Sequence, residues 1–205
     1  MADHIFDTGE TAAAFRYASS WWRSIVGAID DHQWDGPGLG EWTVRELVAH
    51  GDRAYKTIID YLDDGVKDPT EVYSAASYFR IVLAEQTPHV HIAARARKEA
   101  AEVVDWLAET DELGNAAERL VSRRPGDTPV HTFVGEMHLD QYLATRVVEL
   151  VVHGLDLSHA IGLPTSAPPA AARVALTVLL DLCIEEELSD LLRLLTGRDH
   201  GIALR

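Results

Sequence analysis

Apolar residues recur at helical spacing along most of the chain, whereas the alternating pattern of β-strands is almost absent. Gly-rich and Pro-rich segments separate the periodic stretches. The spacing predicts helices over residues 10–32, 43–62, 88–109, 112–124, 135–161, 170–187 and 188–196. Residues 66–87 have mixed polarity and are not assigned to an element. Four long helices with a further C-terminal helical element predict an all-α protein, an antiparallel four-helix bundle with a short helical extension.

The predicted helix 43–62 carries a clear start signal and one inward-facing histidine. Thr43 and Glu46 have the spacing of a capping box, with Trp42 and Leu47 in the positions of a hydrophobic staple. One face of this helix is mostly apolar and holds Leu47, His50, Ala54, Ile58 and Tyr61. The charged residues, Asp52 among them, fall largely elsewhere. We therefore expect His50 to point into the bundle.

A polar stripe runs along the otherwise apolar helix predicted over 135–161. Its residues are separated by three, four and three positions, which places them on one helical face: Arg146, Glu149, His153 and Asp156. Because apolar residues occupy the other sides, this stripe is expected to face the bundle centre. Burying these groups costs several kcal/mol unless they pair with one another or bind a ligand.

Two interpretations of the stripe follow from the residues. In the first, Arg146 pairs with Glu149 and Asp156 holds His153, which makes a self-contained network. In the second, Glu149 and His153 lie one turn apart, about 6 Å along the axis, and bind one metal ion together with His50. Two histidines and one glutamate form a known catalytic zinc set that leaves a position open, although other divalent first-row metals also suit it.

An internal echo raises a further alternative. Residues 46–51 and 149–154 both read Glu-Leu-Val-x-His-Gly, and they lie on two helices far apart in the sequence. A dinuclear site of the ferritin-like kind would use two such helices, but that class has Glu-x-x-His, with a spacing of three instead of four. Glu46 is also expected to serve the capping box.

Composition narrows the class of protein. The 205 residues suit one domain of generous size with an appendage, here residues 1–164 and 165–205. A net charge of -15 argues against nucleic acid or an anionic membrane as partner. No apolar run reaches the roughly 18 residues of a membrane span. Cys183 is the only cysteine, which excludes disulfides within the chain and favours the cytoplasm; we expect it to be a buried thiol. A homodimer is left open.

The two motifs resemble those of a known family. The segments Gly40–His50, with Trp-Thr-Val-Arg-Glu-Leu-Val-Ala-His, and 146–162, with Arg-x-x-Glu-x-x-x-His-x-x-Asp-Leu, resemble the mycothiol-dependent maleylpyruvate isomerase family, one of the DinB-like metal-binding bundles. The resemblance implies a divalent metal, usually zinc, held by His50, Glu149 and His153. It also implies mycothiol or a similar thiol as cosubstrate, used in S-transfer or thiol-assisted cis–trans isomerisation of a small anionic electrophile.

Two points stay open at the level of sequence. Asp156 is expected to orient His153 or Arg146, while Arg146 could instead contact a substrate carboxylate. Full-length members of the family carry a second α/β domain that contributes a basic residue to the substrate site, whereas this chain has about forty residues after Pro164. A bundle that binds a metal or ligand without catalysis is therefore the alternative function.

Overall fold

The computed structural model describes residues 3–63, 70–84 and 88–198. Its elements in chain order are α1 (Thr8–Val26), α2 (Val44–Asp63), α3 (Ala75–Ala84), α4 (Pro88–Glu102), α5 (Trp106–Val121), β1 (Pro129–Thr132), β2 (Gly135–His138), α6 (Leu139–Ala160), α7 (Pro169–Leu182) and α8 (Glu185–Leu195).

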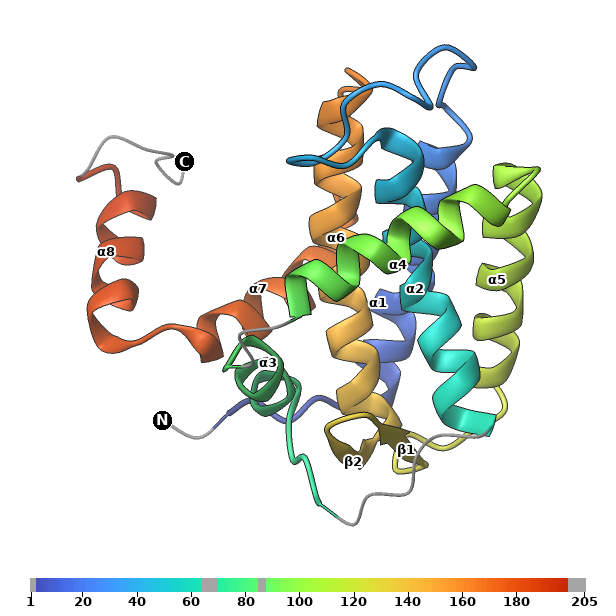
Figure 1. Ribbon diagram of the computed structural model, residues 1–205. Coiled ribbons are helices and arrows are strands. Elements are labelled where there is room, and N and C mark those ends of the chain that lie inside the picture. Colours follow the sequence, from blue (N-terminus) through green and yellow to red (C-terminus); the bar gives the residue numbers. More distant parts are fainter. Residues whose placement is uncertain (1–2, 64–69, 85–87, 199–205) are drawn as a thin grey trace.

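Four helices, α1, α2, α5 and α6, form the bundle. The helices α1 and α6 run in one direction, and α2 and α5 run in the other (Figure 1). The central helix is α6, which packs against α1, α2 and α7 and is buried along most of its length. This confirms the all-α bundle, and it follows from the apolar residues on nearly every side of α6. No helix in the described ranges combines the length and hydrophobicity that crossing a membrane requires.

The starts of α1 and α2 have the chemistry expected of helix N-termini. Asp7 caps α1, and its carboxylate accepts a hydrogen bond of 2.9 Å from the backbone N–H of Glu10. The predicted capping box of α2 is confirmed: the backbone N–H of Thr43 donates to Glu46 at 2.9 Å, and that of Glu46 donates to the Thr43 hydroxyl at 3.3 Å. The first helix was predicted to reach residue 32, but it ends at Val26, and turns follow.

The prediction of one helix over 88–109 is wrong. The chain breaks at residues 103–105, where Asp105 caps a new helix by accepting from the N–H of Ala108. The third long bundle helix is therefore α5, whereas α4 crosses the outside of the bundle against α2 (Figure 1). The apolar periodicity continues across the break and does not reveal it. The sequence indicates the start of α5 only through its capping residue, Asp105.

A β-hairpin precedes α6, although no strand was predicted there and a helix was expected from residue 135. The strands β1 and β2 pair antiparallel, with Pro129 opposite His138 and Thr132 opposite Gly135. Each strand has only four residues, and their burial alternates. Gly135 has a φ of 135°, which few other residues adopt, so the turn depends on this glycine.

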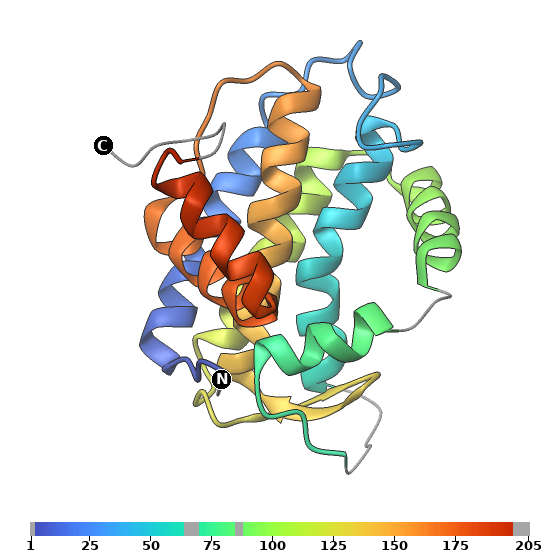
Figure 2. The same ribbon diagram turned by 90° about the vertical axis from the view of Figure 1, so that its left-hand side faces the viewer.

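The C-terminal part consists of two helices with different surroundings. The helix α7 packs against α1 and α6, whereas α8 stands away from the bundle (Figures 1 and 2). Cys183 was predicted to be buried within a helix over 170–187, but α7 ends at Leu182 and Cys183 is a partly exposed residue in extended conformation. The three acids Glu185–Glu187 favour a new helix start, which explains the earlier break. The division at residue 164 stays a prediction.

The repeated motif at residues 46–51 and 149–154 is explained by helix packing. Both of its glycines receive an indole ring from α1: Trp22 packs against Gly51 and Trp21 against Gly154, at contacts that leave no room for a Cβ atom. Adjacent tryptophans on α1 thus dock α2 and α6 through the residue that follows each histidine. The matching motifs place His50 and His153 at equivalent points of two neighbouring helices.

Asp52 does not follow the prediction that the charged residues of α2 lie away from its inward face. Its carboxylate is fully buried, accepting 2.8 Å from the Trp22 indole N–H and 2.7 Å from the Thr110 hydroxyl. It links α1, α2 and α5. Burial raises the pKa of Asp52 to about 7, and the two hydrogen bonds offset only part of that effect.

Candidate metal centre

Three side chains from two antiparallel helices converge where α2 and α6 pack together. Nε2 of His50 lies 3.1 Å from Nε2 of His153, which lies 3.3 Å from Oε2 of Glu149. The third side of this triangle, from His50 Nε2 to the same carboxylate oxygen, measures 4.0 Å. These three residues form the metal-competent cluster found in the described parts of the chain.

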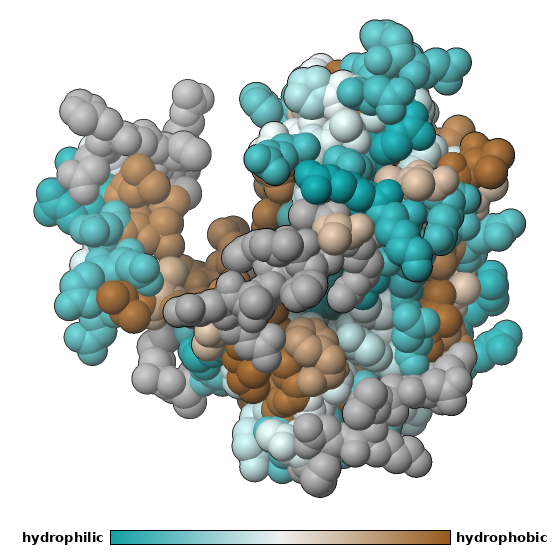
Figure 3. Space-filling model, in the orientation of Figure 1, coloured by the Kyte–Doolittle hydropathy of each residue, from teal (hydrophilic) through white to brown (hydrophobic). Residues whose placement is uncertain are grey.

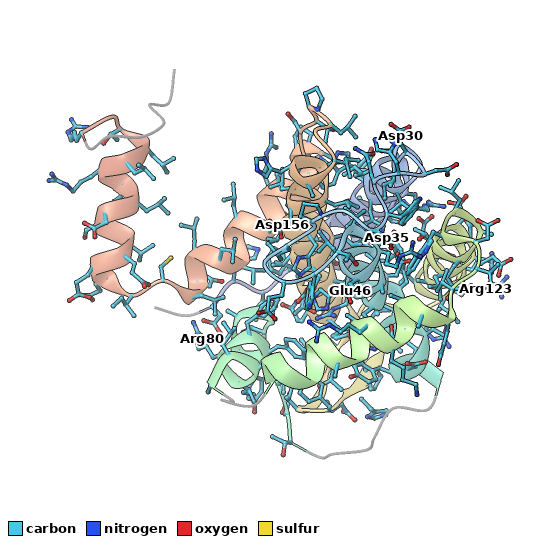
Figure 4. The ribbon with its side chains drawn as sticks, turned by 45° about the horizontal axis from the view of Figure 1, so that its top comes forward. Asp30, Asp35, Glu46, Arg80, Arg123 and Asp156 are labelled. Carbon is cyan, nitrogen blue, oxygen red and sulfur yellow. The ribbon has the colours of Figure 1, made fainter. Side chains whose placement is uncertain are left out.

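The cluster is mostly but not fully buried. The side chains of both histidines are 15% exposed and that of Glu149 is 26% exposed. The Trp42 ring lies 4.7 Å from the His50 ring and flanks the site. Figure 4 shows Asp156 of α6 and Glu46 of α2 on the same face of the bundle, which α4 crosses.

The two histidines have opposite protonation behaviour. Burial lowers the pKa of His50 to about 4, and the neighbouring charge of His153 adds to that effect. Burial also acts to lower the pKa of His153, but hydrogen bonds to Asp156 and Glu149 outweigh it and raise this pKa to about 9. At neutral pH, His153 is therefore the imidazolium and His50 the neutral acceptor.

Two acids hold His153 from both ring nitrogens. Oδ2 of Asp156 lies 3.1 Å from Nδ1, and Glu149 lies at the Nε2 side. Burial would raise the pKa of Glu149, but His153 and Arg146 together lower it to about 2. Asp156 thus lies at the ring nitrogen of His153 that points away from His50 and Glu149.

Arg146 lies deeper, in an aromatic surround. Its guanidinium carbon is 4.9 Å from the Tyr142 ring centroid and 5.7 Å from that of Tyr78. Nε donates to the Thr145 hydroxyl at 3.0 Å, and Nη2 lies 4.0 Å from Glu149. Burial acts to lower the pKa of Arg146, but the tyrosines and Glu149 raise it instead, so this residue stays charged.

The donor set fits a divalent first-row metal. Ligands about 2.0–2.1 Å from a tetrahedral zinc ion lie roughly 3.3 Å from one another, and two of the three observed separations are 3.1 and 3.3 Å. Two imidazole nitrogens and one carboxylate oxygen also leave a coordination position for a further ligand. The far nitrogen of His50, Nδ1, is buried without a hydrogen-bond partner, so His50 lacks the orienting contact that His153 has.

The structure brings together all five predicted site residues: His50, Arg146, Glu149, His153 and Asp156. Their metal binding and individual roles stay predictions. Glu46 instead caps α2 and lies 3.5 Å from Arg97, so it stands outside the cluster. Sequence reasoning missed the contacts of Trp42, Tyr78 and Tyr142 with the site. Tyr142 precedes Arg146 by four positions, so helical spacing alone would have placed both side chains on the same face of the helix.

One family comparison bears on this site. The chain matches the profile of the mycothiol maleylpyruvate isomerase N-terminal domain over residues 15–158. This range covers well over half of the chain and includes all three residues of the cluster, so the chain belongs to this family. Comparisons with curated proteins and with solved structures found no match. The family assignment confirms the resemblance inferred from the two motifs.

Proposed function

We propose that this protein binds one divalent metal ion, zinc in the first place, through His50, Glu149 and His153, and that it catalyses a thiol-dependent reaction of a small anionic electrophile. The convergence of the three donor atoms, which all lie within 4.8 Å of one another, carries this proposal. The thiol is mycothiol or a similar small thiol, in keeping with the family. A cytoplasmic location fits this chemistry, because reduced thiols prevail there.

The metal would supply positive charge that stabilises a thiolate near neutral pH. In an isomerisation, the sulfur bonds to one carbon of a conjugated double bond and an electron pair moves to the conjugated carbonyl oxygen. Rotation about the resulting single bond follows, and return of the electron pair breaks the C–S bond and releases the thiolate. In an S-transfer, the C–S bond remains and the neighbouring carbon takes up a proton.

The side chains around the cluster have separate tasks in this proposal. Asp156 holds the His153 ring so that Nε2 faces the cluster. Arg146 supplies a permanent positive charge beside the cluster and would attract the carboxylate of the electrophile. The exposed nucleophile comes from the cosubstrate, because Cys183 lies in the α7–α8 connection and not at the site.

Metal content and turnover test this proposal together. Protein purified without chelator should carry about one divalent ion per chain, and turnover of maleylpyruvate should require both that ion and mycothiol. His153→Ala should lose both, whereas His159→Ala, at an exposed position of the same helix, should retain both. Stoichiometric metal without turnover of any thiol would support the non-catalytic alternative, and failure to bind added zinc would overturn the metal site.

A further inference from the structure

The guanidinium of Arg146 is held in place by neutral groups. Nε donates to the Thr145 hydroxyl at 3.0 Å, and Nη1 lies 3.5 Å from the Thr57 hydroxyl. Each hydroxyl donates its own proton to a backbone carbonyl, at 2.6 Å for Thr145 and 2.8 Å for Thr57, so both face the guanidinium as acceptors. Two helices, α6 and α2, thus fix this side chain without neutralising its charge.

The third nitrogen, Nη2, makes no hydrogen bond of normal distance and angle within the described parts of the chain. Its ion-pair partner, Oε1 of Glu149, lies 4.0 Å away, which is beyond hydrogen-bonding distance. The other oxygen of that carboxylate belongs to the cluster and lies 3.3 Å from Nε2 of His153. Nη2 therefore holds two unused N–H donors at the edge of the candidate metal centre.

A second polar group beside the guanidinium also lacks a partner. The hydroxyl of Tyr142 is buried without a hydrogen bond of normal geometry in the described parts of the chain, whereas the large majority of buried polar groups in folded proteins have one. The Tyr142 ring lies 4.9 Å from the guanidinium carbon of Arg146. Both unused groups are donors, and a carboxylate, with an oxygen for each, is the small ligand that matches them.

The surroundings of Arg146 keep its charge effective. Tyr78 of α3 lies 5.7 Å from the guanidinium carbon, and the outer surface of α3 is hydrophobic, with Ile81 and Leu83 exposed (Figure 3). The side chain of Arg146 is 7% exposed, and that of Glu149 next to it is 26% exposed. An anion at Nη2 is therefore attracted more strongly than one beside a surface arginine, where water and salt screen the charge.

We propose that Nη2 of Arg146 and the hydroxyl of Tyr142 form a carboxylate subsite beside the cluster, in which Tyr142 determines specificity as a hydrogen-bond donor to the bound anion. The carboxylate binds through its charge and both of its oxygens, so the amide of the same acid is a poor substitute. The use of this subsite for the electrophile rests on the proposed function. The subsite itself consists of side chains alone and does not require the metal.

Binding of a simple acid to the metal-free chain tests the subsite by itself. Crotonate, a small unsaturated monocarboxylate, should bind the chelator-treated protein with a Kd of about 1 mM, as expected for a few charge-assisted hydrogen bonds. Its titration is followed by NMR at the Nε–H of Arg146. Crotonamide, which has the same shape without the charge, should bind at least about tenfold more weakly. Equal binding of the two compounds, or no saturable binding of crotonate, would overturn the proposal.

Two variants and a control locate the donors. Tyr142→Phe removes only the unpartnered hydroxyl and should weaken crotonate binding roughly tenfold without lowering stability, since no hydrogen bond within the chain is lost. Arg146→Lys keeps the charge but loses the planar donor pair, and it should weaken binding at least about tenfold. Tyr17→Phe, at an exposed position of α1, should bind as wild type does. Wild-type affinity in Tyr142→Phe would refute the assigned role of its hydroxyl.

The zinc-loaded chain separates this proposal from the metal centre. Tyr142→Phe leaves His50, Glu149 and His153 in place, so its zinc affinity should equal that of wild type. With an anionic electrophile and thiol, the variant should raise KM by roughly the same factor as it raises the Kd of crotonate, while kcat changes less. A chain that binds no zinc would contradict the proposed function, yet crotonate binding would still decide the subsite. Normal zinc binding without discrimination between crotonate and crotonamide would overturn the subsite alone.

Discussion

Nε2 of His50 lies 3.1 Å from Nε2 of His153, although 103 positions separate the two residues in the sequence. Two imidazole nitrogens at this distance share a proton, because one must donate for the other to accept. With the pKa of His50 at about 4 and that of His153 at about 9, the proton resides on His153 at neutral pH. This proton lies between the two Nε2 atoms, where a shared metal ion would bind.

Zinc binding should therefore release about one proton per chain at neutral pH. His153 is protonated below a pKa of about 9, so the metal competes with this proton, and zinc affinity should fall about tenfold for each pH unit below that value. Calorimetric titration in two buffers of different ionisation enthalpy measures the protons released. An affinity that is the same at about pH 6 and pH 8 would contradict the assigned proton.

Asp156→Asn is the matched variant for this experiment. It keeps an acceptor beside Nδ1 of His153 and removes the negative charge that raises the pKa of His153. The variant should release less than one proton at about pH 8, and its zinc affinity should depend less on pH. Loss of the Asp156 charge should also weaken zinc binding by roughly 10- to 100-fold, as for other carboxylates that pair with metal-binding histidines.

Asp52 should make the protein less stable as the pH rises. Its pKa is about 7 in the folded chain against 3.8 in the unfolded one, so the folded state binds the proton more tightly. The contribution of Asp52 to the free energy of unfolding is therefore fully present below about pH 4 and is lost as the pH rises through about 7. Asp52→Asn preserves both hydrogen bonds, because its oxygen accepts from Trp22 and its NH₂ pairs with Thr110.

Urea unfolding of Asp52→Asn and wild type at two pH values checks this. Between about pH 5 and pH 8 the variant should gain roughly 2–3 kcal/mol relative to wild type. Asp60→Asn, at an exposed position of the same helix, should show no such change. If the two variants behaved alike, Asp52 would have to be ionised in the folded chain at both pH values.

The candidate site was accessible from sequence because helical spacing decides which side chains share a face. Glu149 and His153 differ by four positions, and the apolar residues around them indicate burial on α6. His50 joined them through the inward stripe of α2. Spacing on one helix says nothing about which residues of another helix lie nearby, so the contacts of Trp42 and Tyr78 were not predictable in this way.

Other parts of the fold depend on tertiary contacts that a helical pattern does not encode. Asp52 is polar and falls beside charged neighbours, yet Trp22 and Thr110 supply partners from two other helices that make its burial tolerable. The hairpin strands β1 and β2 have four residues each, too few for alternation to stand out. The break before α5 depends on one capping aspartate, Asp105.

The attachment of α4 to the bundle should be sensitive to salt. Among the described side chains of α4, the buried ones are the small Ala96 and Ala100. Ion pairs supplement them: Glu99 lies 2.8 Å from Arg53 and 3.5 Å from Lys56, both on α2. These partly buried pairs contribute on the order of 1 kcal/mol each, and salt screens them.

Hydrogen exchange followed along the chain measures this attachment. Glu99→Gln should speed exchange in α4 severalfold while exchange in α5 stays unchanged, and added salt should reproduce the effect in wild type. Glu102→Gln, at an exposed position of the same helix, serves as the control. Equal protection of α4 in all three proteins would show that the ion pairs of Glu99 are not needed to attach it.

The glycines that follow the two histidines should tolerate no side chain. A Cβ at Gly51 would overlap the Trp22 ring, and one at Gly154 would overlap the Trp21 ring. Neither ring is free to withdraw, because Trp22 donates to Asp52 and Trp21 donates to Thr165. Overpacking lowers the free energy of unfolding by roughly 1–3 kcal/mol. The higher helix propensity of alanine offsets at most about 1 kcal/mol of this loss.

Gly51→Ala and Gly154→Ala should therefore lower the free energy of unfolding by about 1–2 kcal/mol, measured by urea unfolding. Gly114→Ala is the control, because its Cβ would meet the flexible side chain of Arg23 at 3.2 Å and should change stability by less than about 1 kcal/mol. Gly51→Ala displaces α2 next to His50, and Gly154→Ala displaces α6 next to His153. Zinc affinity should consequently fall at least about tenfold in both, since the two Nε2 atoms can no longer approach one ion together. Normal zinc affinity in a destabilised Gly154→Ala protein would separate the packing of α1 from the geometry of the metal centre.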